Sequence, residues 1–261
     1  MIIKPEFLSQ GEIENLATNF RCQVKKHYGL KQDYGFAGEV FLDYLLDTGQ
    51  ISTYDFTDKE GLSEKVLGKY DLVNRRILIY ENLKNNKGRE NFTIGHEAGH
   101  CILHSRLFEK QYSKIEQQSK GQSLSFIDND ESMNGNTIKD KYSNILEKQA
   151  NLFASFLLMP TDHFSYEFKR IARQVHLDLG VLYLVMNRFT RDIYFSITNH
   201  LMSKFKTSRE ACLFKLIQYG YIIPQKIGSL YITPGEVDIN FLEIRQFIKS
   251  LTNTTRFAGE S

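Results

Sequence analysis

Apolar residues recur at every third or fourth position near the start of the chain, which is the spacing of one face of an α-helix. This pattern predicts an amphipathic helix over residues 11–28. Its apolar face would comprise Ile13, Leu16, Ala17, Phe20 and Val24. A second helix is predicted over residues 36–47, so the chain is expected to begin with two helices that each bury one face.

The part of the chain that follows is rich in β-branched and aromatic residues. Residues 51–54, 66–73 and 76–81 have the composition of short strands, and Asn74 lies where a turn would separate the last two. We therefore expect a small sheet before the pattern becomes helical again near residue 91. A sheet beside a helix could bind an extended peptide along its edge strand.

Two further segments have the pattern of helices buried on much of their surface. The apolar positions of the first are Phe92, Ile94, Ala98, Ile102 and Leu103. Those of the second are Ala150, Phe153, Ala154, Leu157 and Leu158, and Pro160 would end that helix. Between the two helices, residues 105–141 are polar and have little to bury. Such a long polar segment is either a lid over a site or an inert insertion, and both interpretations stay open.

The C-terminal part of the chain is predicted to be mainly helical. Two apolar stripes indicate helices there, namely Phe164, Phe168, Ile171, Ala172 and Val175, and then Leu179, Leu182, Val185, Met186 and Phe189. Two more helices are expected over residues 193–219, with Thr207 or Ser208 as the N-cap of the second. Residues 221–233 are predicted to form a hairpin, and residues 238–250 a last helix.

The first buried helix carries the sequence His96-Glu97-Ala98-Gly99-His100, which is an H-E-x-x-H motif. A spacing of four residues on a helix places His96 and His100 on one face, about 6 Å apart along the axis. Two neutral imidazoles can then bind one ion, and Glu97 lies close enough to act as a general base. Hydrogen-bonded histidines on a buried helix are the alternative interpretation.

A catalytic zinc ion has three protein ligands and an open fourth position, so a third ligand is expected downstream. Glu147 is our candidate, at the start of the second buried helix, and it would complete a gluzincin-like ligand set. Asn151 shares a helix face with Glu147 and could hydrogen-bond one of the ligand imidazoles from outside. A solvated charge near a helix start is the alternative role for Glu147.

A third histidine, His104, continues the four-residue spacing. It would lie about 12 Å along a regular helix from His96, which is too far for both to bind one ion. We therefore expect His104 to support a ligand or cap the helix. The metzincin motif is excluded, because Leu103 stands where that motif needs glycine and Arg106 where it needs histidine.

These segments resemble those of a known family. Residues 92–104, with Phe-Thr-Ile-Gly-His-Glu-Ala-Gly-His-Cys-Ile-Leu-His, and residues 147–160, with Glu-x-x-Ala-Asn-x-Phe-Ala-x-x-Leu-Leu-Met-Pro, are similar to the ImmA/IrrE family of zinc metallopeptidases. Residues 68–70 and 75–80 are similar to the strand pair before the zinc helix of that family. The resemblance covers residues from about 30 to 160.

The resemblance implies a cytoplasmic zinc endopeptidase that cuts a helix-turn-helix repressor of a phage, mobile element or stress locus. It implies His96, His100 and Glu147 as zinc ligands and Glu97 as the general base. The implied fold is α+β, mainly helical, with a zincin-like core that has a small sheet beside the H-E-x-x-H helix. This core would span residues 1–160.

The resemblance is weaker in the remainder, residues 161–261, where only residues 200–222, within the segment 193–222, are similar to the helix-turn-helix-like part of the family. The interval between His100 and Glu147 is longer than the family pattern. Glu131 and Asp130 therefore remain alternatives for the third ligand.

Composition is that of a globular intracellular protein. The chain is 41% hydrophobic and 25% charged, with 33 basic and 31 acidic residues. Its three cysteines include no C-x-x-C pair, which argues against a disulfide framework or a cysteine zinc site. The N-terminus has no apolar signal core, and no segment approaches the roughly 18 apolar residues of a membrane span.

Two functional questions stay open at this point. The rival to a peptidase is a non-catalytic regulatory module that has the same fold and recognises a repressor or DNA. The basic residues Lys204, Lys206, Arg209 and Lys215 would form a modest positive patch, but a net charge of +2 does not favour direct DNA binding. The donor that stabilises the oxyanion is also undetermined, with His104 and His163 among the candidates.

Overall fold

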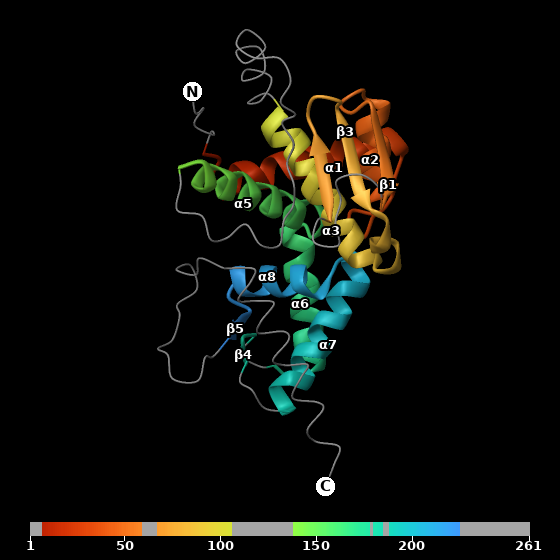
Figure 1. The fold of residues 1–261 in the computed structure, drawn as a ribbon. Coiled ribbons are helices and arrows are strands. Elements are labelled where there is room, and N and C mark those ends of the chain that lie inside the picture. Colours follow the sequence, from red (N-terminus) through yellow and green to blue (C-terminus); the bar gives the residue numbers. More distant parts are fainter. Residues whose placement is uncertain (1–6, 59–66, 106–137, 178–179, 185–187, 225–261) are drawn as a thin grey trace. The chain divides into compact units, whose positions relative to one another are not determined.

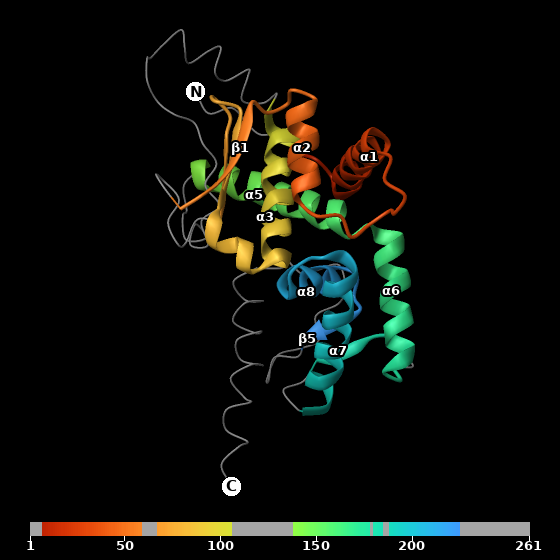
Figure 2. The ribbon, with the colours of Figure 1, turned by 90° about the vertical axis from the view of Figure 1, so that its right-hand side faces the viewer.

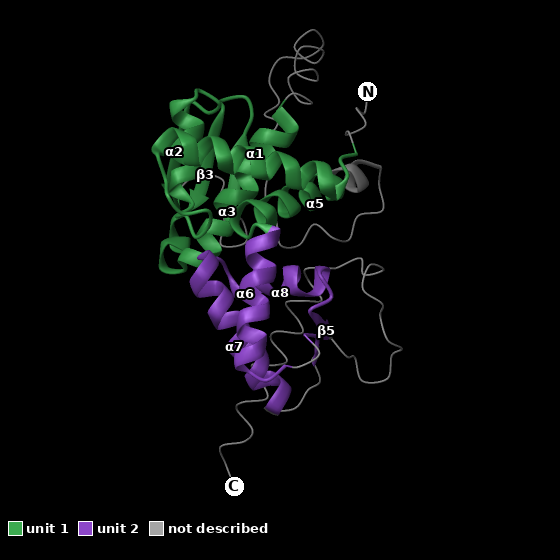
Figure 3. Cartoon of the chain, turned by 180° about the vertical axis from the view of Figure 1, so that it is seen from behind, with its two compact units in different colours: residues 1–160 green, residues 161–261 purple. Residues whose placement is uncertain are grey.

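The computed structural model describes residues 7–58, 67–105, 138–177, 180–184 and 188–224. These residues form a mainly helical α+β structure with a small mixed three-stranded sheet (Figure 1). The chain divides into two compact units, residues 1–160 and residues 161–261 (Figure 3). Most of the polar segment 105–141, the hairpin beyond residue 224 and the helix predicted over 238–250 lie outside the described residues.

Helix α1, Gln10–Tyr28, begins and ends with standard capping residues. Ser9 and Glu12 form a capping box, in which each side chain accepts a hydrogen bond from the other's backbone N–H. Gly29 ends the helix with φ of +63°, a conformation that costs glycine little. Ile13, Ala17, Phe20 and Val24 are buried as predicted, but Leu16 is 38% exposed.

Helix α2, Glu39–Asp47, follows α1, and the two pack through aromatic rings. The ring of Phe20 lies 6.0 Å from that of Phe41 and 5.5 Å from that of Tyr44. The helix predicted over residues 36–47 is therefore present, with its first turn at Glu39. Within the described part of the chain, no helix is long and apolar enough to cross a membrane.

Three strands form the sheet in the order β1-β3-β2. Strand β1, Thr53–Thr57, runs parallel to β3, Arg76–Tyr80, whereas β2, Gly68–Asp71, runs antiparallel to it. Ile77 is paired with Tyr54 on one side and with Tyr70 on the other. Strand β2 is thus an edge strand, and it packs against helix α3.

The turn between β2 and β3 is made by Asp71, Val73, Asn74 and Arg75. The Asp71 carboxylate accepts hydrogen bonds from the backbone N–H groups of Val73 and Asn74, at 3.1 and 3.2 Å. Arg75 has φ of +48°. The turn predicted near Asn74 is therefore confirmed, because aspartate and asparagine offer the local hydrogen bonds that a tight turn needs.

Most of the H-E-x-x-H motif lies in helix α3, Lys87–Gly99. This helix follows the short 3₁₀ helix η1, Glu81–Asn85. Asn86 caps α3 by accepting a hydrogen bond from the N–H of Arg89. Beyond Gly99 the helix continues as η2, His100–His104, with wider π-helical turns. The sequence predicted a regular α-helix as far as His104, so this last turn is a correction.

Helix α5, Ile138–Leu158, closes the first unit. It starts at Ile138, so residues 138–141, which the sequence assigned to the polar segment, are helical. Figure 2 shows α3 between the sheet and α2, with α5 crossing it. The contact between α3 and α5 is the most extensive one between two elements of the described chain.

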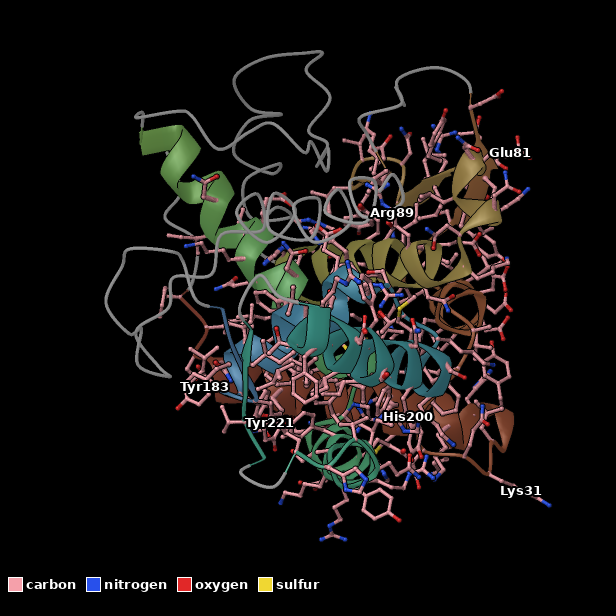
Figure 4. All side chains as sticks on the ribbon, turned by 90° about the horizontal axis from the view of Figure 1, so that it is seen from below. Lys31, Glu81, Arg89, Tyr183, His200 and Tyr221 are labelled. Atoms are coloured by element: carbon pink, nitrogen blue, oxygen red, sulfur yellow. The ribbon has the colours of Figure 1, made fainter. Side chains whose placement is uncertain are left out.

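The second unit contains the helices α6, Thr161–Gln174, α7, Arg188–Phe205, and α8, Arg209–Gln218. Its core is aromatic, with the ring of Phe168 stacked on that of Tyr221 at 4.1 Å. His200 of α7, labelled in Figure 4, lies 2.7 Å from the buried Glu167 carboxylate of α6. This hydrogen bond and the stacked rings connect elements of the second unit.

The helix predicted across Leu179, Leu182, Val185, Met186 and Phe189 is wrong at Leu182, which lies in a strand. Strand β4, Leu182–Leu184, pairs in parallel with β5, Ile222–Pro224. The hairpin predicted over residues 221–233 is described only as far as residue 224, where β5 pairs with β4, and the remainder of it lies outside the described residues. The error at Leu182 arises because an apolar run of this length suits a helix or a buried strand equally well.

The segment predicted to resemble a helix-turn-helix contains α7 and α8, which are joined by residues 206–208. Ser208 caps α8 by accepting a hydrogen bond from the N–H of Ala211, as one of the two predicted N-caps. Residues 211–217 are all buried. Seven consecutive residues cover every side of a helix, so this part of α8 is buried all round.

Candidate metal centre

Three side chains from two helices converge on one point. His96 comes from α3, His100 from the first position of η2, and Glu147 from α5. The Nε2 atoms of the two histidines lie 3.0 Å apart. One carboxylate oxygen of Glu147 lies 3.1 Å from Nε2 of His96, and the other lies 3.4 Å from Nε2 of His100.

These separations fit one tetrahedral zinc ion. With zinc–ligand bonds of about 2.0–2.1 Å, neighbouring ligand atoms in a tetrahedron are about 3.3–3.4 Å apart. The three observed separations of 3.0, 3.1 and 3.4 Å are close to this value. The group His96, His100 and Glu147 can therefore hold a metal ion, as its donor types and their closeness allow.

The hydrogen bond on the far side of His96 supports the same conclusion. Its Nδ1 atom lies 2.9 Å from the side-chain oxygen of Asn151. An amide oxygen can only accept, so Nδ1 of His96 carries the proton and Nε2 presents a lone pair. That lone pair faces His100 and Glu147 in a region where both rings are only 1% exposed, and a cation would stabilise this arrangement.

Glu147 has the electrostatics of an ionised ligand. Burial disfavours the charged carboxylate, but the neighbouring imidazoles of His100 and His96 outweigh burial. Together they hold the pKa of Glu147 well below its usual range. The side chain keeps 20% of its exposure, whereas both histidines are almost fully buried, so the centre opens on the side of Glu147.

His104 lies beyond His100 and does not join the ligand group. Its Nδ1 atom is 3.1 Å from Nδ1 of His100, and its Nε2 atom is 3.1 Å from the side-chain oxygen of Gln149. Burial, followed by the neighbouring imidazole of His100, lowers the pKa of His104 to about 3. A neutral His104 can accept a hydrogen bond from a neighbouring ring, which fits the supporting position expected from the sequence.

Glu97 lies between the histidines in the sequence and is fully buried. It is turned toward strand β2, because a Cβ atom added to Gly68 would lie 2.7 Å from the Oε1 atom of Glu97. The same added atom would lie 2.7 Å from Cγ2 of Thr93. Only a glycine at position 68 lets the edge strand approach the Glu97 carboxylate this closely.

The two helices that carry the ligands approach each other through small residues. A Cβ atom added to Gly99 would lie 3.2 Å from the Cα and carbonyl oxygen of Ala150. One added to Gly95 would lie 3.3 Å from the Cβ of Ala154. The two glycines are four residues apart on α3, and the two alanines are four residues apart on α5, so each pair lies on one face of its helix. Their small size allows α5 to lie near enough for Glu147 to reach both histidines.

Sequence reasoning did not assign a role to the glycines at 68, 95 and 99 or to Gln149. For Gln149 a signal was present, because it is a polar residue on a helix expected to be buried. Of the other candidates, His163 lies on α6 in the second unit, and Asp130 and Glu131 lie outside the described residues. Glu147 is thus the candidate third ligand that the structure brings to the two histidines.

Comparison with known proteins adds no further assignment. No model of a known protein family matches the chain, and no curated protein matches it. The centre is therefore described by its own geometry, which consists of two buried imidazoles and one carboxylate within 4.8 Å of one another.

Proposed function

We propose that this chain is a zinc-dependent endopeptidase with a zincin-like core, in which His96, His100 and Glu147 bind zinc and Glu97 is the general base. The observation that carries the proposal is the convergence of three ligand atoms from α3, η2 and α5 at separations suited to one zinc ion. Three protein ligands leave a fourth position for water or substrate, as hydrolytic zinc sites require.

The chain's own residues supply the remaining parts of the reaction. When bound, zinc supplies the Lewis acidity that polarises the scissile carbonyl and lowers the pKa of an attacking water. Glu97 would accept the proton from that water and later return it to the departing amine. Its burial against Gly68 restricts the orientation of the carboxylate, which is what a general base needs.

The substrate class comes from the resemblance to the ImmA/IrrE family, which implies a cytoplasmic helix-turn-helix repressor. The burial of residues 211–217 of α8 favours this assignment over direct DNA binding, because a helix buried on every side offers little surface to a groove. We therefore expect the chain to act on a protein partner. Candidate repressors are those encoded beside its gene.

The test is to incubate the purified chain and zinc with such a repressor and to identify new termini by mass spectrometry. Glu97→Gln keeps the size of the side chain but removes the base, so zinc should stay bound while the cleavage rate falls about 10²–10⁴-fold. A zinc-bound chain whose Glu97→Gln variant cuts as fast as the original would contradict the assigned base. Binding of the repressor without any cleavage would favour the non-catalytic regulatory module instead.

A further inference from the structure

We infer that His104 and Gln149 are positioning residues, which hold His100 in the one neutral tautomer that can bind a metal ion. The inference rests on the metal centre of the proposed function and is independent of whether the chain cuts peptides. Three side chains form the connection: Gln149 of α5, and His104 and His100 of η2.

The direction of the connection is set at Gln149. The Oε1 atom of Gln149 lies 3.1 Å from Nε2 of His104, and an amide oxygen only accepts hydrogen bonds. Nε2 of His104 must therefore carry its proton. A neutral imidazole has one N–H group, so Nδ1 of His104 is left with a lone pair.

The second step transfers this constraint to the proposed ligand. Nδ1 of His104 lies 3.1 Å from Nδ1 of His100, and only one of these two atoms can donate. Because Nδ1 of His104 accepts, Nδ1 of His100 carries the proton. The lone pair of His100 is then on Nε2, which is the atom that lies 3.0 Å from His96 and 3.4 Å from Glu147.

Burial makes this connection necessary. His104 is 2% exposed and Gln149 is 4% exposed, so bulk water does not reach either group to replace a missing acceptor. His96 obtains the same tautomer more simply, from the single amide of Asn151. The π-helical turn over His100–His104 sets how the two rings meet, with centroids 5.2 Å apart.

A pair of variants at position 149 separates this role from simple packing. Gln149→Met keeps the length of the side chain but removes the strong acceptor, and zinc binding should weaken about 10–100-fold. Gln149→Glu keeps an acceptor, and it should restore affinity to within about threefold of the original. Zinc affinity is measured by competition with a chromophoric chelator, and Co²⁺ absorption spectra report the geometry of the ligands.

Equal zinc affinity in Gln149→Met and the original chain, or equal loss in Gln149→Met and Gln149→Glu, would overturn the inference. Should Gln149→Met not fold, the unaltered zinc-loaded chain decides. Nitrogen-15 NMR of its imidazoles should show His104 protonated on Nε2 and His100 on Nδ1, and His104 protonated on Nδ1 would overturn the inference. Zinc binding with these tautomers but without peptidase activity would instead count against the proposed function alone.

Discussion

Helices α3 and α8 each contain a run of seven buried residues, but the buried side chains differ in kind. Residues 93–99 of α3 and residues 211–217 of α8 are each seven consecutive buried residues. In α3 this stretch includes His96 and Glu97. In α8 it is apolar apart from Lys215, whose ammonium group lies 5.6 Å and 5.4 Å from the ring centres of Phe164 and Tyr219.

The difference shows which kind of buried polar residue marks a functional site. Burying an ionisable group is costly unless a partner compensates for the lost water. In α8 the buried ammonium group of Lys215 lies over the faces of two aromatic rings, and such contacts stabilise a buried cation. In the region of α3, ligand atoms from three elements converge on one point, which packing alone does not require.

The strongest test of this contrast removes one carboxylate from each region. Glu147→Gln takes the negative charge from the α3 centre, and we expect zinc affinity to fall by more than the roughly 100-fold that loss of an outer partner costs. Glu210→Gln, in the first turn of α8, should leave zinc binding unchanged. Metal analysis after dialysis, with thermal unfolding in added zinc, measures both; equal zinc content in the two variants would contradict the assigned ligand.

A smaller effect is expected from widening the contact between α3 and α5. Gly99→Ala would place a methyl group 3.2 Å from the backbone of Ala150, and overpacking of this kind costs about 1–3 kcal/mol. Zinc affinity should fall with stability, because Glu147 moves away from the histidines. Gly99 has ordinary helical dihedral angles, so backbone strain does not contribute.

The control for this change is Gly11→Ala in α1. An added Cβ at Gly11 has no atom within 4 Å, and the substitution should raise stability by up to about 1 kcal/mol. Denaturant unfolding and chelator competition give both quantities for both variants. If Gly99→Ala bound zinc as tightly as Gly11→Ala, the close approach of the helices would not be what places Glu147.

Much of the first unit follows from local patterns in the sequence. Helix α1 and the turn at Asn74 depend on residues close in the chain, such as Ser9, Glu12 and Asp71, whose hydrogen bonds are local. The two histidine ligands could also be predicted from the sequence, because the H-E-x-x-H spacing places two imidazoles on one helical face. Glu147 was proposed from the family resemblance and from an expected position at a helix start, but α5 begins at Ile138 and Glu147 lies inside it.

Features that depend on packing between distant segments could not be predicted from the sequence. The residues of strand β4 were predicted as helix, because the local pattern does not show their pairing with β5. That pairing joins residues 40 positions apart, Leu182 with Ile222. The wide turn over His100–His104 has no periodic signal, since it arises where the helix end meets α5. The roles of Gly68 and Gly99 likewise appear only when the neighbouring strand and helix are in place.

The smallest expected effect is the loss of stability when the N-cap of α3 or of α8 is removed, and it should be equal for the two helices. Asn86 caps α3 and Ser208 caps α8, each by accepting a backbone N–H hydrogen bond at 3.2 Å. Asn86→Ala and Ser208→Ala should each lower the free energy of unfolding by about 1 kcal/mol. Neither should change zinc affinity, because both caps lie at helix starts, away from the converging ligand atoms.

Denaturant unfolding measures the stability of both cap variants, and chelator competition measures their zinc affinity. Equal losses of stability with unchanged zinc affinity would show that the N-caps stabilise α3 and α8 equally and do not shape the metal centre. Their difference would then lie in the side chains that each one buries. A selective loss of zinc affinity in Asn86→Ala would contradict this, because the geometry of the centre would then depend on how α3 begins.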